Sequence, residues 1–244
     1  MRKTIKNAVF ILLVLTLSVS TALLAYLHFS ASDDKDLSGE WTANIDMTEQ
    51  AAVTAFSWLQ DIEGVSVSYK EIESYMQELT VQVNLTFEQT ERSAGIFRCN
   101  ISTESYEACN QAVYAAFASV FQELLTERLR MTDYAGSTDK EAIEALVTET
   151  FGMSTVSYLM SYGPTLLPSL EDLQAEYDGS GTYEITDDIL TRQFEVGGSV
   201  PTKAEYYIRK ESNLILSEEI DSVSDGPLLD YYPMIYTLRQ TLDQ

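Results

Sequence analysis

Histidine is nearly absent from this chain, and its absence excludes several kinds of chemistry. The single histidine is His28, which directly follows an apolar N-terminal run. General-base histidines, Ser-His-Asp and Cys-His nucleophile systems and imidazole metal sites are therefore excluded from the residues beyond it. The sequence also has no glycine-rich phosphate loop, no nucleophile elbow and no zinc-ligand spacing. We accordingly expect no catalysis and no cofactor.

Cysteine is almost as scarce, because Cys99 and Cys109 are the two in the chain. They lack the C-x-x-C spacing, so a redox-catalytic role is not expected. In an exported chain, two cysteines favour one disulfide bridge, which the chain-entropy model values at about 3 kcal/mol for so short a loop. Two buried thiols are the alternative.

Basic residues are few. The chain has 15 lysines and arginines against 38 aspartates and glutamates, with a net charge of −23 and a pI near 4.2. Such a charge repels nucleic acid and anionic membrane surfaces, so neither is expected as a partner. Solubility outside the cell explains the charge more simply than an acidic recognition surface does. Hydrophobic residues make up 45% of the chain, which is enough for a packed core.

The first residues resemble a membrane-spanning helix. An uncharged, mostly apolar run at 8–27 has 20 residues, and as a helix it would span about 30 Å, one hydrocarbon core. Arg2, Lys3 and Lys6 precede this run. By the positive-inside rule, the rest of the chain then lies outside the cytoplasm.

We therefore expect residues 1–28 to be a membrane anchor, so that the membrane is itself a partner, and residues 29–38 to be a polar spacer. The alternative is a cleaved secretory signal, because small residues around Ser20 provide cleavage-like sites. In that case the chain would be secreted.

Strict alternation of apolar and polar residues predicts strands. It is clearest from Leu79 to Phe87, which indicates one buried and one solvated face, as in an antiparallel sheet. Turn signals separate the other predicted strands, and closing them on one another would remove exposed edges. These strands are expected at 39–46, 96–101, 181–186, 189–196, 203–209, 214–220 and 232–240.

Helical spacing of apolar residues predicts helices in two places. One helix is expected at 48–60, whereas residues 65–78 are ambiguous. Three helices are expected between the third and fourth strands. The first lies at 104–130, the second begins at a capping box formed by Thr138 to Glu141, and the third lies at 154–162. The predicted fold class is therefore mainly β with α+β character: an antiparallel barrel of about eight strands with a helical insertion between strands three and four.

The first strand begins with Gly39-x-Trp41, placed like the G-x-W signature of the lipocalin-like (calycin) group. The chain resembles bacterial members of that group at 37–102 and 178–240. The resemblance implies a barrel domain at 39–240, with Gly39 and Trp41 as structural residues and Arg239 of the last strand packed over the Trp41 ring. The compact family barrel lacks the helical insertion at 103–177.

Three functions agree with these features. The first is a membrane-tethered, extracytoplasmic lipocalin-like protein that binds an apolar small molecule or an envelope partner without catalysis. The second is a structural interaction module whose barrel is filled by side chains; a cavity of several hundred Å³ would separate the two. The third is a carboxylate-dependent hydrolase, which needs a pair of carboxyl groups and a raised pKa on one of them. The carboxylates weighed for this role are Glu71, Glu73, Glu78, Glu171 and Asp172.

Overall fold

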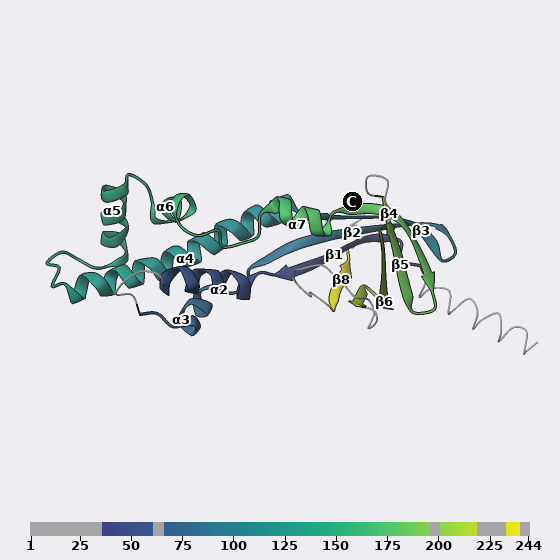
Figure 1. Ribbon diagram of the computed structural model, residues 1–244, viewed down its shortest axis with the longest axis horizontal. Helices are drawn as coiled ribbons and strands as arrows, with labels where there is room; N and C mark the ends of the chain where they lie inside the picture. The colour runs from purple at the N-terminus through teal and green to yellow at the C-terminus, as the bar shows by residue number, and fades with distance from the viewer. Residues whose placement is uncertain (1–35, 61–65, 196–200, 219–232, 240–244) are drawn as a thin grey trace, which may run out of the picture. The chain divides into compact units, whose positions relative to one another are not determined.

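The computed structural model is built on a closed barrel of eight antiparallel strands, ordered in space as they are in sequence (Figure 1). It describes residues 36–60, 66–195, 201–218 and 233–239. The predicted fold class is confirmed. The strands are β1 (Gly39–Asp46), β2 (Thr80–Glu91), β3 (Ala94–Ile101), β4 (Gly179–Thr186), β5 (Ile189–Phe194), β6 (Thr202–Lys210), β7 (Asn213–Glu218) and β8 (Met234–Leu238).

Alternation along each strand separates the inside of the barrel from its outside. In β2 the buried side chains are Val81, Val83, Leu85 and Phe87, each followed by a more accessible polar residue. The last strand returns to the first, because the Arg239 N–H donates to the Glu40 carbonyl at 2.7 Å. This bond closes the barrel and satisfies backbone groups that an open edge would expose.

Six helices lie within the described ranges. Four of them form the insertion between β3 and β4, where the sequence predicted it. Within this group the long helix α4 contacts α5 and α6, and it also contacts α3 (Figure 1). The helices are α2 (Thr48–Gln60), α3 (Tyr69–Tyr75), α4 (Thr103–Met131), α5 (Lys140–Phe151), α6 (Thr155–Tyr162) and α7 (Leu170–Tyr177).

Side-chain caps determine where these helices begin. Ser68 and Ser169 each open a capping box, at α3 and α7, and these are two helices that the sequence did not predict. Helix α5 begins one residue later than expected, because the Asp139 carboxylate accepts from the Ala142 N–H at 2.8 Å. A negatively charged carboxylate at the N-cap also interacts more favourably with the helix dipole than the neutral Thr138 hydroxyl would.

The chain divides into two compact units. Among the described residues, the barrel unit comprises 36–41, 86–98, 180–195, 201–218 and 233–239, and the helical unit comprises 42–60, 66–85 and 99–179. The chain passes between them four times, and each passage lies within one of the strands β1, β2, β3 and β4. Each unit has its own buried side chains, such as Leu190 in the barrel unit and Phe117 in the helical unit.

The predicted anchor or signal at 1–28 lies outside the described residues, as does the spacer up to residue 35. Within the described ranges, none of the helices combines the length and apolar character that crossing a membrane requires.

Candidate functional site

The lumen of the barrel is the first candidate site, because a lipocalin-like protein would hold its ligand there. Nine apolar side chains that point inward in the barrel unit have at most 3% of their surface accessible, and Tyr207 has 8%. Side chains lining an empty cavity of several hundred Å³ would present surface to it, so these side chains fill the space. They are Trp41, Phe87, Phe97, Tyr183, Ile185, Leu190, Leu214, Leu216 and Tyr236.

Gly95 shows how closely the lumen is packed. It points inward on β3, and a Cβ there would lie 2.7 Å from a ring carbon of Tyr183. The Tyr183 side chain crosses over this glycine and meets Phe87 edge-to-face, with 4.9 Å between ring centroids. Among the described residues the buried Tyr183 hydroxyl has no hydrogen-bond partner. Burial raises the pKa of Tyr183 to about 12, and the nearby charge of Asp36 adds to this effect.

A buried ion pair occupies another part of the lumen. Arg192 on β5 donates from Nε to Glu205 Oε2 on β6 at 2.8 Å, and its Nη2 lies 2.6 Å from the same oxygen. Lys203 Nζ lies 3.7 Å from the other carboxylate oxygen. The guanidinium carbon lies 5.6 Å from the ring centroids of both Phe97 and Phe194, in cation–π contact. Fixed charges and rings therefore occupy space that an apolar ligand would need.

The G-x-W residues have structural roles that the structure explains. Gly39 has a φ of +134°, and a Cβ there would lie 2.7 Å from Leu238 Cδ1, so the position requires glycine. Trp41 is fully buried, and its indole N–H donates to the Leu37 carbonyl at 2.8 Å. Arg239 Nη1 lies 3.9 Å from Glu40 Oε2, with a largely exposed side chain. Among the described residues, Arg192 makes cation–π contacts with Phe97 and Phe194, and the contact of Arg239 with Trp41 stays a prediction.

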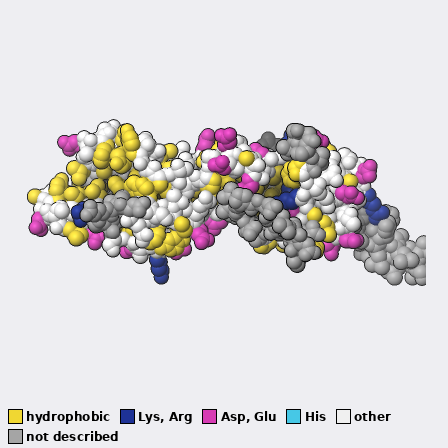
Figure 2. All heavy atoms as spheres, viewed as in Figure 1, with side chains coloured by type: hydrophobic (Ala, Val, Ile, Leu, Met, Phe, Trp, Pro, Cys, Tyr) yellow, Lys and Arg dark blue, Asp and Glu magenta, His cyan; other side chains and the backbone are white. Residues whose placement is uncertain are grey.

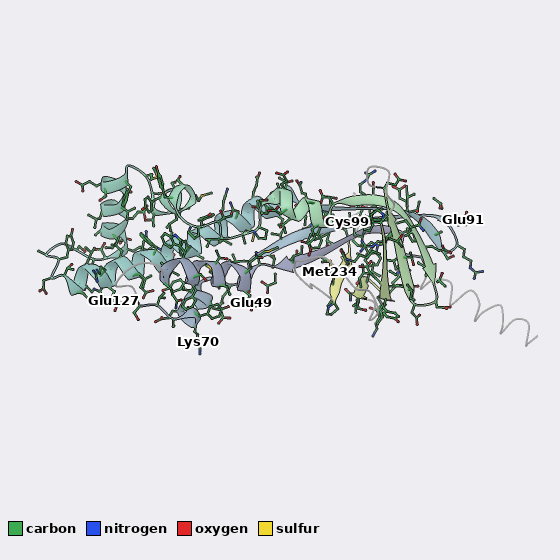
Figure 3. The ribbon with its side chains drawn as sticks, in the orientation of Figure 1. Glu49, Lys70, Glu91, Cys99, Glu127 and Met234 are labelled. Atoms are coloured by element: carbon green, nitrogen blue, oxygen red, sulfur yellow. The ribbon has the colours of Figure 1, made fainter. Side chains whose placement is uncertain are left out.

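Cys99 on β3, labelled in Figure 3, and Cys109 on α4 are both buried in the helical unit. The structure holds them as thiols and does not contain the predicted disulfide. Burial raises the pKa of Cys109 to about 11, and the charge of Asp46 contributes to the rise. Such a thiol is unreactive at neutral pH. The bridge stays a prediction, and thiol counting tests it.

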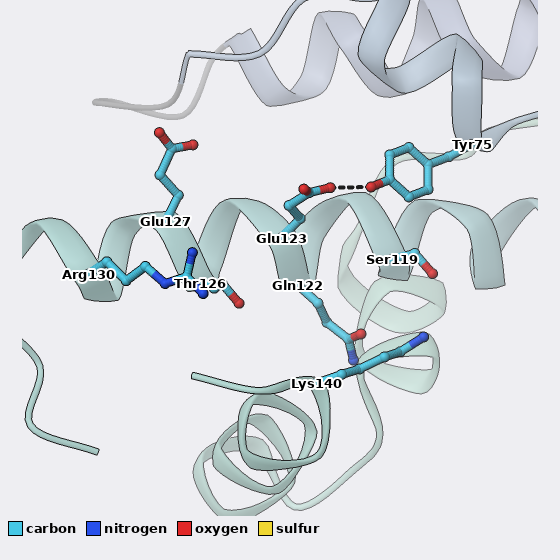
Figure 4. A pocket seen from close by; sticks show the side chains of 8 residues that line it. All are labelled: Tyr75, Ser119, Gln122, Glu123, Thr126, Glu127, Arg130 and Lys140. Atoms are coloured by element: carbon cyan, nitrogen blue, oxygen red, sulfur yellow. Dashed lines mark hydrogen bonds between the residues drawn. The ribbon is translucent and has the colours of Figure 1, made fainter. Parts of the chain in front are cut away.

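The helical unit offers a second candidate, a hollow of about 550 Å³ (Figure 4). The Tyr75 hydroxyl donates to the Glu123 carboxylate at its edge, and this bond raises the pKa of Tyr75. Acidic and basic side chains share the lining, which suits neither an apolar molecule nor a single ionic charge. The lining residues are Tyr75, Ser119, Gln122, Glu123, Thr126, Glu127, Arg130 and Lys140.

A polar network joins three helices beside this hollow. Glu144 of α5 accepts from the Thr155 N–H at 3.1 Å and from the Thr155 hydroxyl at 2.6 Å, at the start of α6. Gln122 of α4 donates to the same carboxylate at 2.6 Å and to Thr155 at 3.1 Å. The network fixes the helices relative to one another, and Gln122 and Thr155 are buried within it. Its role is therefore structural.

The third candidate is an aromatic cluster, defined as Phe121, Phe151, Tyr158 and Tyr162. Tyr158 lies at its centre, 4.3 Å from Phe151, 5.4 Å from Tyr162 and 6.4 Å from Phe121 between ring centroids. Tyr162 is 67% exposed and Phe151 is 46% exposed. Hydrophobic side chains gather over α5 and α6 in Figure 2. Helix α6 contains no charged residue, so this surface differs sharply from the acidic chain as a whole.

Two of the five carboxylates considered for hydrolysis cap helices. Glu71 and Asp172 are the third residues of capping boxes, where they accept from the backbone of Ser68 and Ser169. The hydrogen bonds from Ser68 lower the pKa of Glu71, the opposite of what a general acid requires. Within the described ranges, no group of three histidine, cysteine or acidic side chains is arranged to hold a metal ion.

Sequence reasoning missed the Arg192–Glu205 pair, although a signal for it was present. Leu190 and Arg192 share one face of β5, and Glu205 and Tyr207 share one face of β6, so alternation places both charges inside. The aromatic cluster was missed because its rings come from three helices, and which of them meet depends on helix packing. Comparisons with protein-family models, curated proteins and solved structures find no match to this chain.

Proposed function

We propose that this chain is a bacterial, membrane-tethered extracytoplasmic protein that acts as a non-catalytic interaction module, with an envelope protein as its partner. The filled lumen is the observation that carries this proposal. Among the described residues, inward side chains that are buried this fully disfavour a small molecule in the lumen. Its contribution is then a rigid framework, and binding falls to the outer surface.

Two features support the absence of catalysis. The residues beyond His28 contain no histidine, and Glu71 and Asp172 are engaged in helix capping. The predicted anchor supports the tether, since a basic flank precedes an apolar run of the right length.

The aromatic cluster is the surface that best fits a partner. Tyrosine and phenylalanine supply large contact areas at little entropic cost, and such residues are enriched at interfaces. The net charge of −23 favours a partner that surrounds its apolar contact residues with basic ones. The partner on this proposal is an envelope protein with that chemistry.

The filled lumen is tested by removing one inward side chain. Leu214 is fully buried on β7, so Leu214→Ala is expected to lower the free energy of unfolding of the full chain by about 2–5 kcal/mol. The matched control is Ile215→Ala, on the outer face of the same strand. This variant should lower the free energy of unfolding by less than about 1 kcal/mol. Equal costs for both variants would contradict a filled lumen and return the small-molecule hypothesis to first place.

The partner surface is tested by photo-crosslinking in intact cells that display the full chain. A crosslinking amino acid at Tyr162 is expected to give one adduct of defined mass, whereas the same group at Thr182 on β4 should give none. The adduct should also disappear when Met160, an exposed neighbour on α6, is changed to glutamate. Identical adducts from both positions would refute a specific interface at the aromatic cluster.

A further inference from the structure

The outer face of the barrel carries a row of isoleucines that the core does not need. Ile208 on β6 pairs with Ile215 on β7, which pairs with Ile235 on β8, so the three lie side by side across adjacent strands. Their neighbours Tyr207, Leu214 and Tyr236 point inward and are buried. Ile208 is 62% exposed and Ile235 is 56% exposed. We call these three residues the isoleucine row.

Apolar character continues beyond the row. Tyr206 on β6 is 39% exposed and pairs with Ile189 on β5, two residues further along the strands. The solvated face of an antiparallel sheet normally carries polar side chains at such positions. A contiguous apolar strip over four strands therefore indicates a surface that something covers.

The isoleucine row lies near the end of the barrel at which the chain enters. Two residues beyond the row, Lys210 pairs with Asn213 and Asn213 with Thr237. At the same rim Leu238 N–H donates to the Ser212 carbonyl at 2.7 Å, and Gly39 at the start of β1 lies against Leu238. Two residues of a strand span about 7 Å, so the row is that far from the entry rim.

The length of the spacer limits how far this rim can lie from a membrane. Residues 29–38 comprise ten residues, which reach at most about 35 Å when fully extended. With the anchor in the bilayer, the entry rim stays within that distance of the lipid surface. Contact with lipid then becomes an intramolecular event with a high effective concentration, so a small apolar surface suffices.

The charge at the entry rim differs from that of the chain as a whole. Counting only the described residues, three basic residues there are matched by three acidic ones, whereas the chain carries a net charge of −23. A locally neutral rim avoids the repulsion that the remaining acidic surface would meet near lipid headgroups. The basic residues are Arg209, Lys210 and Arg239, and the acidic ones are Asp36, Glu40 and Glu211.

We infer that the isoleucine row is a membrane-docking face, which lies against the lipid bilayer and holds the barrel unit flat on it. This inference rests on the membrane tether of the proposed function. A neutral phosphatidylcholine surface is the ligand it specifies, because the net acidic charge disfavours anionic lipid. Side-on docking would fix which surfaces of the barrel face away from the membrane.

Quenching by brominated lipid tests this docking directly. The full chain is reconstituted into phosphatidylcholine vesicles with dibrominated acyl chains, and a tryptophan probe is placed by Ile208→Trp or Ile235→Trp. The matched control is Thr182→Trp, on the outer face of β4. With the natural tryptophans subtracted, quenching at the isoleucine row is expected to exceed that at Thr182 by about threefold or more.

A second variant separates docking from mere tethering. With the probe at Ile215→Trp, changing Ile208 and Ile235 to threonine should reduce the quenching to the level of Thr182→Trp, because threonine keeps the β-branched shape and removes apolar area. Unchanged quenching would overturn the inference, as would a dimer crosslinked through the row, since a second copy would then cover it. Vesicle flotation separates the two proposals: chain that fails to float contradicts the tether, whereas chain that floats with unquenched probes contradicts docking alone.

Discussion

The barrel unit and the helical unit each hold a carboxylate in a polar network, and they satisfy it in different ways. Glu205 in the barrel faces the cations Arg192 and Lys203, whereas Glu144 in the helical unit accepts from the neutral groups of Thr155 and Gln122. A buried ion pair gains little net stability, because desolvation offsets most of the attraction. The barrel therefore uses its charges to specify which side chains meet, and the helical unit uses its network to join helices.

The two tryptophans allow the units to be observed separately. Trp41 belongs to the barrel unit and Trp58 to the helical unit, where its ring meets Phe117 at 5.6 Å between centroids. Fluorotryptophan incorporation gives one fluorine NMR signal for each residue, without any substitution. Each signal then reports the unfolding of its own unit during a urea titration.

The largest effect is expected from breaking the buried ion pair. Arg192→Met removes the closest cation from Glu205 and should lower the free energy of unfolding by about 3–5 kcal/mol in urea denaturation. The double variant Arg192→Met/Glu205→Leu should recover most of this loss, since no buried charge then remains and the Lys203 side chain is 48% exposed. If the single and double variants were equally unstable, packing rather than charge would explain the loss.

Glycine positions offer the next comparison between units. Gly39→Ala should cost about 3 kcal/mol, because the φ of +134° is strained for alanine and Leu238 must move. Gly152, which ends α5, has a φ of +75°, and a Cβ added there would meet no atom within 4 Å. Gly152→Ala should therefore cost about 1 kcal/mol, from the left-handed backbone alone. Thermal unfolding measures both, and a larger cost at Gly152 would refute the steric account.

Disrupting the polar network of the helical unit should lower the free energy of unfolding by less than Gly39→Ala does. Glu144→Gln replaces one acceptor oxygen by an amide donor that faces the donors of Thr155 and Gln122. We therefore expect the free energy of unfolding to fall by about 2 kcal/mol. The loss should show first in the Trp58 signal. Glu149→Gln, at an exposed position on the same helix, serves as the control and should leave both signals unchanged.

Removing the Tyr183 hydroxyl should raise stability, whereas the variants above lower it. Tyr183→Phe removes a buried hydroxyl that has no partner among the described residues, so stability near pH 7 should rise by about 1 kcal/mol. The pKa of Tyr183 is about 12 in the folded chain against 10.0 ordinarily, so the unfolded chain loses its proton first as the pH rises. Wild-type stability should therefore fall from about pH 10 to pH 12, and Tyr183→Phe should lack this component of the fall. Tyr206→Phe, at an exposed position, is the control and should leave the stability near pH 7 unchanged.

The state of the two cysteines is measured by alkylation of their thiols. Denatured, unreduced protein is expected to take up two equivalents of an alkylating reagent, as the two thiols of the structure require. Native protein should react slowly at pH 8, because a pKa of about 11 leaves Cys109 almost entirely protonated. Uptake of no reagent by the denatured protein would instead establish the disulfide bridge.

Local patterns predicted most of the architecture. Alternation along Val81, Val83 and Leu85 identified β2, and helical spacing located the insertion between β3 and β4. Helix α3, with 7 residues, lies in the segment that stayed ambiguous, and α7, with 8 residues, was missed, although Ser68 and Ser169 open capping boxes. In such short helices the caps are a stronger signal than apolar periodicity.

The buried ion pair and the isoleucine row could be predicted much less well, since both depend on the register between neighbouring strands. Arg192 meets Glu205 because β5 and β6 align Leu190 with Glu205, an alignment that no local pattern specifies. The isoleucine row likewise exists only because Ile208, Ile215 and Ile235 fall in line across three strands. Each isoleucine alone resembles an ordinary strand residue.

The passages of the chain between the two units limit how such a protein can arise by recombination. All four passages fall within strands, so no segment of the gene encodes the helical unit and nothing else. A continuous deletion from α2 to α7 would also remove β2 and β3, and with them the closure of the barrel. The two units are therefore inherited together, and a single recombination cannot transfer the whole helical unit, with α2 and α3 included, to another barrel.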